Sequence, residues 1–553
     1  MPMTTIAGCL LPQAPSQNGE LRVDKASGPS RHESLWTAAG RSLPWLAAAL
    51  AIGVRLAAGS FPVDDAYITF RYARNLADGL GMIYNPGELV FGTSTLPFTV
   101  YLGSLGRALG VEALPTYALI TSAMADGAAV LLLGLLCRRL PLNPGWLALT
   151  VLLQAMAPLS IRYSGSGLET SVATALFIAA VSAYLARRDI LAANLAGAAA
   201  ALRPDGIAVA GLLVALLTYE RKRIPWKSIA ILAAWILPSA ILLASLYGSP
   251  LPNSVTAKSA TIYHADPWTN ALQFIYHFGG LFVGGPRGLS ARGIIIPLVG
   301  RLTLVLSLTT VPQLLLWIWG GYELFTRDRR WLAFLALPLV FVVAYSLLGL
   351  RGSIMAEWYL PPLIPFYLLP ILIGLRAALL RFTPHAFRPA AVTLAILLVV
   401  CEILGLNLGR NPSRPFLTPL SVWDERERLY RDTALFLEPL LGPGSVVAAS
   451  EIGALGYYCD CRILDTVGLV SPQALAYYPL PPEDTPALNA IPEGLIQDQR
   501  PEFVVSLEVF VRETLLDDPW FLDHYDQIWR RETDAFGSDG LLVFRRRNGP
   551  SLP

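Results

Sequence analysis

The sequence is poor in charged residues. Only 15% of its 553 residues are Asp, Glu, Lys or Arg, whereas a soluble protein averages about 25%. At the same time 54% are hydrophobic, and the mean hydropathy is +0.50. This excludes a water-soluble single-domain enzyme with a few apolar patches. It predicts an α-helical polytopic membrane protein.

Acidic residues are scarcest in the first three quarters of the chain. Residues 1–419 contain 18 of them, together with 31 basic residues, which gives a net charge of +13. Residues 420–553 contain 22 acidic and 11 basic residues, which gives −11. We therefore predict a membrane module over 43–419 and an extracytoplasmic soluble domain over 420–553. Residues 1–42 are polar and predict a disordered cytoplasmic tail.

Cysteine is also rare, with five residues. Cys459 and Cys461 are too closely spaced for an easy mutual disulfide, and no His cluster accompanies them, which argues against zinc. The C-terminal region lacks a phosphate-binding glycine loop and a nucleophile elbow. A helix over 424–441 and short apolar runs at 446–449, 462–464, 503–506 and 541–544 predict a small α/β domain.

Long apolar runs predict about eleven transmembrane helices. The clearest cover 43–60, 116–136, 145–162, 168–186, 229–247, 294–322, 331–350, 358–380 and 389–408. Residues 189–218 predict a hairpin that turns at Arg203-Pro204. Pairs of Lys and Arg recur at alternate span ends, which places the N-terminus in the cytoplasm and the C-terminal domain outside a bacterial cytoplasmic membrane.

The first outer loop, residues 61–115, carries two adjacent acids, Asp64 and Asp65. The pattern predicts a helix with Asp64 as N-cap and Gly79 as its stop, and a second amphipathic helix over 96–109. The acids could serve this helix only as cap and dipole partner. Alternatively, they form a general base at the membrane boundary, where unpaired carboxylates are costly without a function.

This loop resembles that of the GT-C glycosyltransferases. Residues 64–81 read DDAYITFRYARNLADGLG, followed by YNPGE at 84–88 and GTSTLP at 92–97. The segments SGLET at 166–170, LRPDG at 202–206 and PNSVTAK at 252–258 are also similar, as are IGA at 452–454 and LDTVGL at 464–469. The subgroup most similar is the mycobacterial terminal arabinofuranosyltransferases. The resemblance covers most of residues 43–545.

The resemblance implies an inverting transferase that takes a sugar, by analogy arabinofuranose, from a polyprenyl-phosphate donor. The acceptor is then a glycan or glycolipid at the outer face, and no nucleic acid is involved. The catalytic Asp corresponds to Asp64 or Asp65, and we favour Asp64 because it comes first in the motif. Asp65 would support it or help to hold a divalent cation. The sequence does not decide whether a metal is needed.

A departing phosphate requires positive charge. Arg203 is the leading candidate because it interrupts an apolar stretch; Arg71, Arg74 and Lys258 are others. We expect sugar or acceptor contacts from Glu169, Tyr67, Asp205, His264 and Tyr359. GT-C relatives often carry an Arg-Tyr pair where this chain has Trp358-Tyr359, and this departure leaves a contact there open.

Two alternatives remain open at this stage. A protein or oligosaccharyl transferase of the same fold would differ only in its acceptor. A flippase or transporter of lipid-linked sugars would show matched halves with broken helices, and we see no such internal symmetry. A non-catalytic scaffold would not explain the charged residues at outer span ends.

Overall fold

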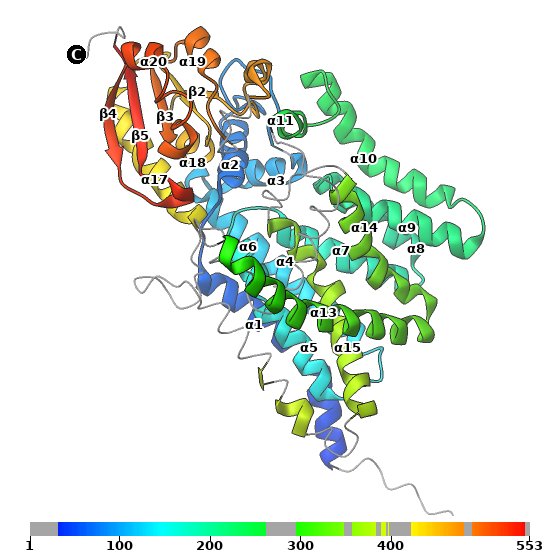
Figure 1. Cartoon of the computed structure of the whole chain (residues 1–553). Helices are drawn as coiled ribbons and strands as arrows, with labels where there is room; N and C mark the ends of the chain where they lie inside the picture. Colours follow the sequence, from blue (N-terminus) through cyan, green and yellow to red (C-terminus); the bar gives the residue numbers. More distant parts are fainter. Residues whose placement is uncertain are drawn as a thin grey trace, which may run out of the picture.

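The computed structural model describes residues 31–93, 95–261, 295–347, 357–382, 389–393, 396–397, 422–480 and 489–547. A helical bundle forms one part and a domain with a small β-sheet forms the other (Figure 1). The predicted domain boundary at residue 420 lies outside the described residues and stays a prediction.

The described part of the chain before the C-terminal domain consists of helices and their connections. Two of them, α2 and α3, follow the first long helix. Helix α2 lies against the C-terminal domain, and α3 packs against α2 and against α4 and α8 of the bundle (Figure 1). The α-helices are α1 (Arg31–Ala58), α2 (Asp64–Ala77), α3 (Leu96–Leu109), α4 (Leu114–Cys137), α5 (Pro144–Met156), α6 (Pro158–Ser164), α7 (Thr170–Leu185), α8 (Asp189–Leu202), α9 (Gly206–Arg221), α10 (Trp226–Tyr247), α11 (Asn253–Thr261), α13 (Ile295–Arg327), α14 (Leu332–Leu347) and α15 (Ile364–Phe382). Short 3₁₀ turns are η1 (Val111–Ala113), η2 (Arg329–Trp331), η4 (Glu357–Tyr359) and η5 (Pro361–Leu363).

Several of these helices are long and apolar enough to cross a membrane. Within the described ranges they are Gly40–Ala58, Val111–Cys137, Trp226–Tyr247 and Pro361–Phe382. The pair α5 and α6, bent by 41° at Ala157-Pro158, would make a fifth span, and α7 and α8 are shorter apolar helices. The chain is therefore a multi-pass membrane protein. The predicted total of about eleven spans includes segments outside the described residues and stays a prediction.

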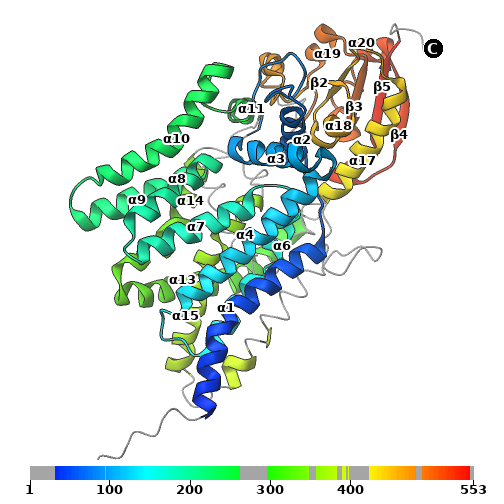
Figure 2. The same ribbon diagram turned by 180° about the vertical axis from the view of Figure 1, so that it is seen from behind.

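A buried ion pair fixes α1 to α4, which lie side by side (Figure 2). Arg55 Nε lies 2.8 Å from Asp126 Oδ2, and both side chains are almost fully buried. Removing either partner would leave an uncompensated charge in an apolar bundle, which typically costs about 3–5 kcal/mol.

The hairpin predicted over 189–218 is present. Helix α8 ends at Leu202, Arg203 is extended with φ −144° and ψ 145°, and α9 begins at Gly206. Proline disfavours helical backbone in the residue before it, so Pro204 explains why the chain breaks at Arg203. Helices α7, α9 and α10 pack around α8, which places Arg203 inside the bundle.

The C-terminal domain holds a five-stranded mixed sheet in the order β2-β1-β3-β5-β4. Strand β1 is parallel to β2 and β3, whereas β5 is antiparallel to β3 and β4. Its elements are α17 (Val422–Leu437), η6 (Glu438–Leu440), β1 (Val446–Ala449), α18 (Gly453–Tyr458), β2 (Arg462–Asp465), η7 (Pro472–Tyr477), α19 (Glu493–Gln499), β3 (Phe503–Leu507), η9 (Glu508–Phe510), α20 (Pro519–His524), β4 (Tyr525–Arg531), η10 (Ala535–Gly537) and β5 (Leu541–Arg546). The predicted helix and strands are confirmed. Strand β4 was missed because it is a mostly exposed edge strand and lacks an apolar run.

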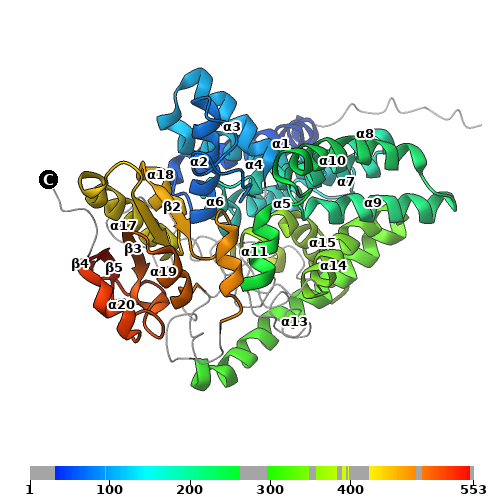
Figure 3. The ribbon, with the colours of Figure 1, turned by 90° about the horizontal axis from the view of Figure 1, so that it is seen from above.

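Seen from above, α2 and α18 lie side by side where the domain meets the bundle (Figure 3). On the other side of this contact, Asn253 in α11 donates to the carbonyls of Gly468 and Leu469, at 2.7 and 2.8 Å. The domain is therefore attached to the bundle at two places, through α2 and through α11.

Candidate functional site

The start of α2 is joined to the loop between α6 and α7. The N–H of Val63 donates to the carbonyl of Ser166 at 3.1 Å. The loop then turns at Gly167, whose φ of +79° suits glycine, and a Cβ there would lie 2.9 Å from a side chain of α2. These contacts join the start of α2, which carries Asp64 and Asp65, to the loop that leads to Glu169, the N-cap residue of α7.

Asp64 does not cap α2, contrary to the sequence prediction. Val63 occupies the N-cap position, and no side chain makes a cap hydrogen bond there. Instead Asp64 Oδ1 accepts the backbone N–H of Gly453 in the C-terminal domain at 2.6 Å. A partner 389 residues away supplies this hydrogen bond, so local capping rules could not identify it.

This contact leaves no room for a side chain at Gly453. A Cβ there would lie 2.6 Å from Asp64 Oδ1 and would also overlap the carbonyl oxygen of Asp64. We expect Gly453→Ala to loosen the contact and destabilise the docked domain by about 1–3 kcal/mol, as overpacking does. Thermal unfolding and limited proteolysis in detergent measure the change. Gly442→Ala is the control, since its Cβ would meet only Ser445 Oγ at 3.8 Å; equal behaviour of the two variants would contradict the prediction.

Behind Asp64 lies a buried cluster of charged side chains. Arg426 lies 2.6 Å from both Glu427 and Glu451, and Asn489 donates to Glu451 at 2.7 Å. Burial, followed by the neighbouring glutamates, raises the pKa of Asp64 well above its usual range. Burial also raises the pKa of Glu451, and that of Glu427 to about 7. The C-terminal domain thus faces Asp64 with two buried glutamates whose pKa values are raised.

These raised pKa values predict how docking depends on pH. The pKa of Glu427 is near 4.5 in the unfolded chain and about 7 in the folded protein. Between these two pH values Glu427 is protonated in the folded state and ionised in the unfolded state. Stability is therefore greatest at low pH and falls as pH rises through this window, by on the order of 3 kcal/mol for Glu427. We expect the melting temperature of the wild type to fall more steeply from pH 5 to 8 than that of Glu427→Gln. Glu438→Gln changes an exposed position, so its melting temperature should depend on pH as that of the wild type does. The same dependence on pH in all three proteins would show that Glu427 is not the group responsible.

A second charged cluster lies at the α8–α9 turn. Arg203 forms a bidentate ion pair with Asp205: its Nε lies 3.0 Å from Oδ1 and its Nη2 lies 3.2 Å from Oδ2. Its Nη1 lies 3.1 Å from Glu169 Oε1. Nη1 also donates to Thr170 at 3.2 Å, and the Tyr345 hydroxyl donates to Asp205 at 3.4 Å. The structure therefore brings together three predicted residues from two separate sequence motifs.

Aromatic side chains line the space beside this cluster. The Arg203 guanidinium lies over the Tyr359 ring, 5.2 Å from its centre. The centre of the Tyr359 ring lies 6.0 Å from that of the Trp358 ring, which in turn lies 6.4 Å from the centre of the Tyr163 ring. Arg162 lies over the Tyr163 ring at 5.9 Å. The Trp358 ring is tilted against Tyr359 and edge-on to Tyr163, and aromatic rings next to buried cations are typical of carbohydrate and phosphate recognition sites.

Sequence reasoning missed Arg162. It is 6% exposed and lies in α6, at the end of the broken span. The signal was the same as for Arg203, namely a cation within an apolar run. Tyr345 was missed because an aromatic residue in a span is ordinarily a packing residue.

The predicted phosphate ligands Arg71 and Arg74 are used in domain contacts. Arg71 is 3% exposed and donates to the carbonyls of Tyr84, Gly456 and Cys461 at 2.9, 2.6 and 2.7 Å. Arg74 donates to the carbonyl of Tyr457 at 2.8 Å. Both therefore bind α2 to α18 and to the segment that follows α18, and we do not propose either as a phosphate ligand.

The remaining candidates fall into two groups. Tyr67 is buried among aromatic rings, with Phe70, Tyr457 and Tyr458 all within 5.8 Å of its ring centre. Lys258 belongs to α11, but its side chain lies outside the described residues, as does His264 entirely. Within the described part of the chain, no three His, Cys, Asp or Glu side chains are arranged to hold a metal ion.

Cys459 and Cys461 form a disulfide, which corrects the expectation that their spacing disfavours one. Their Cα atoms lie 5.2 Å apart, within the range that a disulfide allows. A single intervening residue in a turn can bring Cα atoms this close, which spacing in the sequence alone did not reveal. The disulfide closes the turn whose Cys461 carbonyl accepts Arg71.

Comparisons with known proteins agree with this architecture. Residues 421–545 match the family model "Domain of unknown function (DUF8728)". The crystal structure of ArnT from Cupriavidus metallidurans bound to undecaprenyl phosphate aligns over 94% of this chain and 99% of ArnT, with TM-score 0.50 and 14% identity. The apo ArnT structure aligns over 90% of this chain and 97% of ArnT, with the same score and identity.

One sequence relative is a terminal β-(1→2)-arabinofuranosyltransferase of Mycobacterium tuberculosis. It is 27% identical over 241 residues, which cover 39% of this chain and 37% of the relative. The match thus spans well under half of that enzyme.

Proposed function

Because the chain has the GT-C fold, we propose that it is an inverting glycosyltransferase that uses a polyprenyl-phosphate sugar as donor. The observation that carries the proposal is the Glu169–Arg203–Asp205 cluster, together with the hydrogen bond from Val63 to Ser166 that joins the start of α2, with Asp64 and Asp65, to the loop before Glu169. The undecaprenyl phosphate bound to ArnT supports a lipid-phosphate donor of this class.

Asp65 is the proposed base. The adjacent Asp64 is held in place by the hydrogen bond that it accepts from the Gly453 N–H. This reverses the preference from the sequence, because the Asp64 carboxylate already accepts the N–H of Gly453 in the C-terminal domain, and Asp65 is the adjacent carboxylate at the same end of α2. The acceptor hydroxyl oxygen attacks the anomeric carbon while Asp65 takes its proton. The bond from that carbon to the phosphate oxygen breaks, and polyprenyl phosphate leaves with the bonding electrons.

The leaving phosphate requires positive charge, which Arg203 and Arg162 would supply. Asp205 holds the Nε side of Arg203, so the donor phosphate would share the Nη1 side with Glu169. Glu169 would then be released to accept a hydrogen bond from a sugar hydroxyl. Tyr359 and Trp358 provide flat faces on which a sugar ring can stack.

The sugar, the acceptor and the orientation belong to the proposal. The arabinofuranosyltransferase relative supports arabinofuranose transfer to an envelope glycan or glycolipid. The disulfide supports an extracytoplasmic C-terminal domain, since disulfides persist in oxidising compartments. We also propose that the N-terminus lies in the cytoplasm of a bacterial cell, which the positions of Lys and Arg at alternate span ends support.

Reconstitution tests the proposal against transport or transfer to protein. The purified protein in liposomes is given radiolabelled decaprenyl-phosphate arabinose together with an arabinan oligosaccharide or a peptide. We expect label on the oligosaccharide and none on the peptide. Label that crosses the bilayer without any transfer would identify a flippase and overturn the proposal, and label on the peptide would reassign the acceptor.

A further inference from the structure

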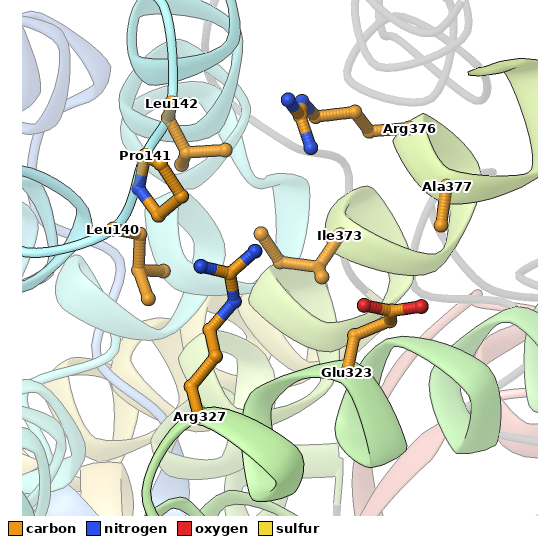
Figure 4. A pocket seen from close by; sticks show the side chains of 8 residues that line it. All are labelled: Leu140, Pro141, Leu142, Glu323, Arg327, Ile373, Arg376 and Ala377. Carbon is orange, nitrogen blue, oxygen red and sulfur yellow. The ribbon is translucent and has the colours of Figure 1, made fainter. Parts of the chain in front are cut away.

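A cavity lined by charged and apolar side chains lies at the end of the bundle opposite to the C-terminal domain. It is bounded by the α4–α5 loop, the last turns of α13 and the second half of α15 (Figure 4). Its lining residues are Leu140, Pro141, Leu142, Glu323, Arg327, Ile373, Arg376 and Ala377. Figure 4 shows the Arg327 and Arg376 guanidinium groups directed into the same space from two different helices.

The arginines are fixed in place by close packing of α13 against α15. A Cβ at Gly320 would overlap the carbonyl of Pro370, and one at Gly374 would overlap the carbonyl of Leu316. The two helices therefore approach backbone to backbone about two turns before Arg327 and about half a turn before Arg376. This brings two positive charges to one cavity and keeps them there despite their repulsion.

Neither arginine has a counter-ion within the described residues. The nearby Arg330 lies 3.0 Å from Asp189 and 2.7 Å from Glu220, and Arg187 pairs with Asp328 at 3.3 Å. By contrast, no ion pair or hydrogen bond joins Arg327 or Arg376 to another described side chain, and Glu323 is the one acid in the cavity wall. The cavity thus carries a net charge of about +1 beside an apolar wall.

The position of this cavity at the end of α4 indicates that it lies at a membrane surface. Val111, just before α4, accepts the Tyr457 hydroxyl of the C-terminal domain, whereas Leu140 follows the other end of α4. The 24 residues of α4 span about 36 Å, close to the thickness of a bilayer. The cavity therefore lies at the headgroup level of the leaflet opposite to the C-terminal domain, far from Arg203.

We propose that this cavity binds the phosphodiester headgroup of a membrane phospholipid. The phosphate would lie between Arg327 and Arg376, and an acyl chain would continue along Leu142 and Ile373. Glu323 disfavours a second negative charge, which argues for a phosphodiester over a phosphomonoester. This site is separate from the proposed donor site and does not depend on the proposed function.

Lipid binding by the full-length protein tests this proposal. Protein in phosphatidylcholine nanodiscs is titrated with fluorescent phosphatidylglycerol, and native mass spectrometry counts retained lipid. We expect Arg327→Gln/Arg376→Gln to weaken binding about tenfold or more, as loss of charge-assisted hydrogen bonds does. Glu323→Gln should strengthen it.

Controls separate this site from general surface charge and from free phosphate. Arg139→Gln/Arg329→Gln removes the same charge from residues outside the cavity and should bind phosphatidylglycerol like the wild type. Equal weakening by both double variants would overturn the proposal. So would displacement of the lipid by low millimolar inorganic phosphate, which would identify a site for the free ion.

Discussion

Asp65→Asn is expected to lower the turnover number for sugar transfer by about 10²–10⁴-fold, the usual contribution of a general base. Asparagine keeps the size of the side chain but cannot take the acceptor proton. Undecaprenyl phosphate should bind the variant as tightly as it binds the wild type, because Asp65 does not hold the phosphate in our proposal. Steady-state transfer assays and a lipid-binding titration measure the two quantities.

Two further substitutions test whether this role belongs to Asp65. Asp78→Asn, at the exposed C-terminal end of the same helix, should transfer sugar like the wild type. Asp64→Asn can still accept the Gly453 N–H through its amide oxygen, so substantial transfer should remain. If Asp64→Asn abolishes transfer while Asp65→Asn does not, Asp64 is the base and our assignment is wrong.

Removal of the Arg203 charge is expected to weaken binding of undecaprenyl phosphate about 10–100-fold. A single Arg203→Gln change is a poor test, because it leaves Glu169 and Asp205 buried without their cation. Such a loss typically costs about 3–5 kcal/mol and could unfold the protein. We therefore favour the triple variant Arg203→Gln/Glu169→Gln/Asp205→Asn, in which no charge is left unpaired.

The matched control keeps Arg203 and neutralises only its partners. Glu169→Gln/Asp205→Asn should bind undecaprenyl phosphate at least as well as the wild type, because the guanidinium then has no competing carboxylates. Without lipid this variant leaves the buried Arg203 charge unpaired, which typically costs about 3–5 kcal/mol, so thermal unfolding first checks that it is folded. If it is unfolded, the triple variant is compared with the wild type instead. Equal affinity of the triple variant and this double variant, measured in the same detergent, would show that Arg203 does not hold the phosphate.

Much of the architecture was predictable because it depends on local pattern. The bounds of α3, the hairpin break at Arg203-Pro204 and the helical stop at Gly79 all follow from hydrophobic periodicity and from Pro and Gly. Strands β1, β2, β3 and β5 followed from their apolar runs. Arg203 was identified because a charge in an apolar stretch is costly without a function.

The roles of the charged residues in the first loop were not predictable in the same way. Arg71 and Arg74 look like phosphate ligands in the sequence, but both donate to carbonyls of the C-terminal domain more than 380 residues away. The same holds for Asp64 and Gly453. Arg426, Glu427 and Glu451 resemble ordinary surface charges until the fold buries them beside the loop. Such contacts depend on how the C-terminal domain docks, which no local pattern encodes.

A structure of the protein with bound undecaprenyl phosphate tests the central claim most directly. We predict that the phosphate lies within hydrogen-bonding distance of Arg203, with the Asp65 carboxylate facing the space next to it and Asp64 still bound to Gly453. A phosphate located instead beside Arg71 and Arg74, or on the far side of the bundle from Asp65, would contradict the proposed active site.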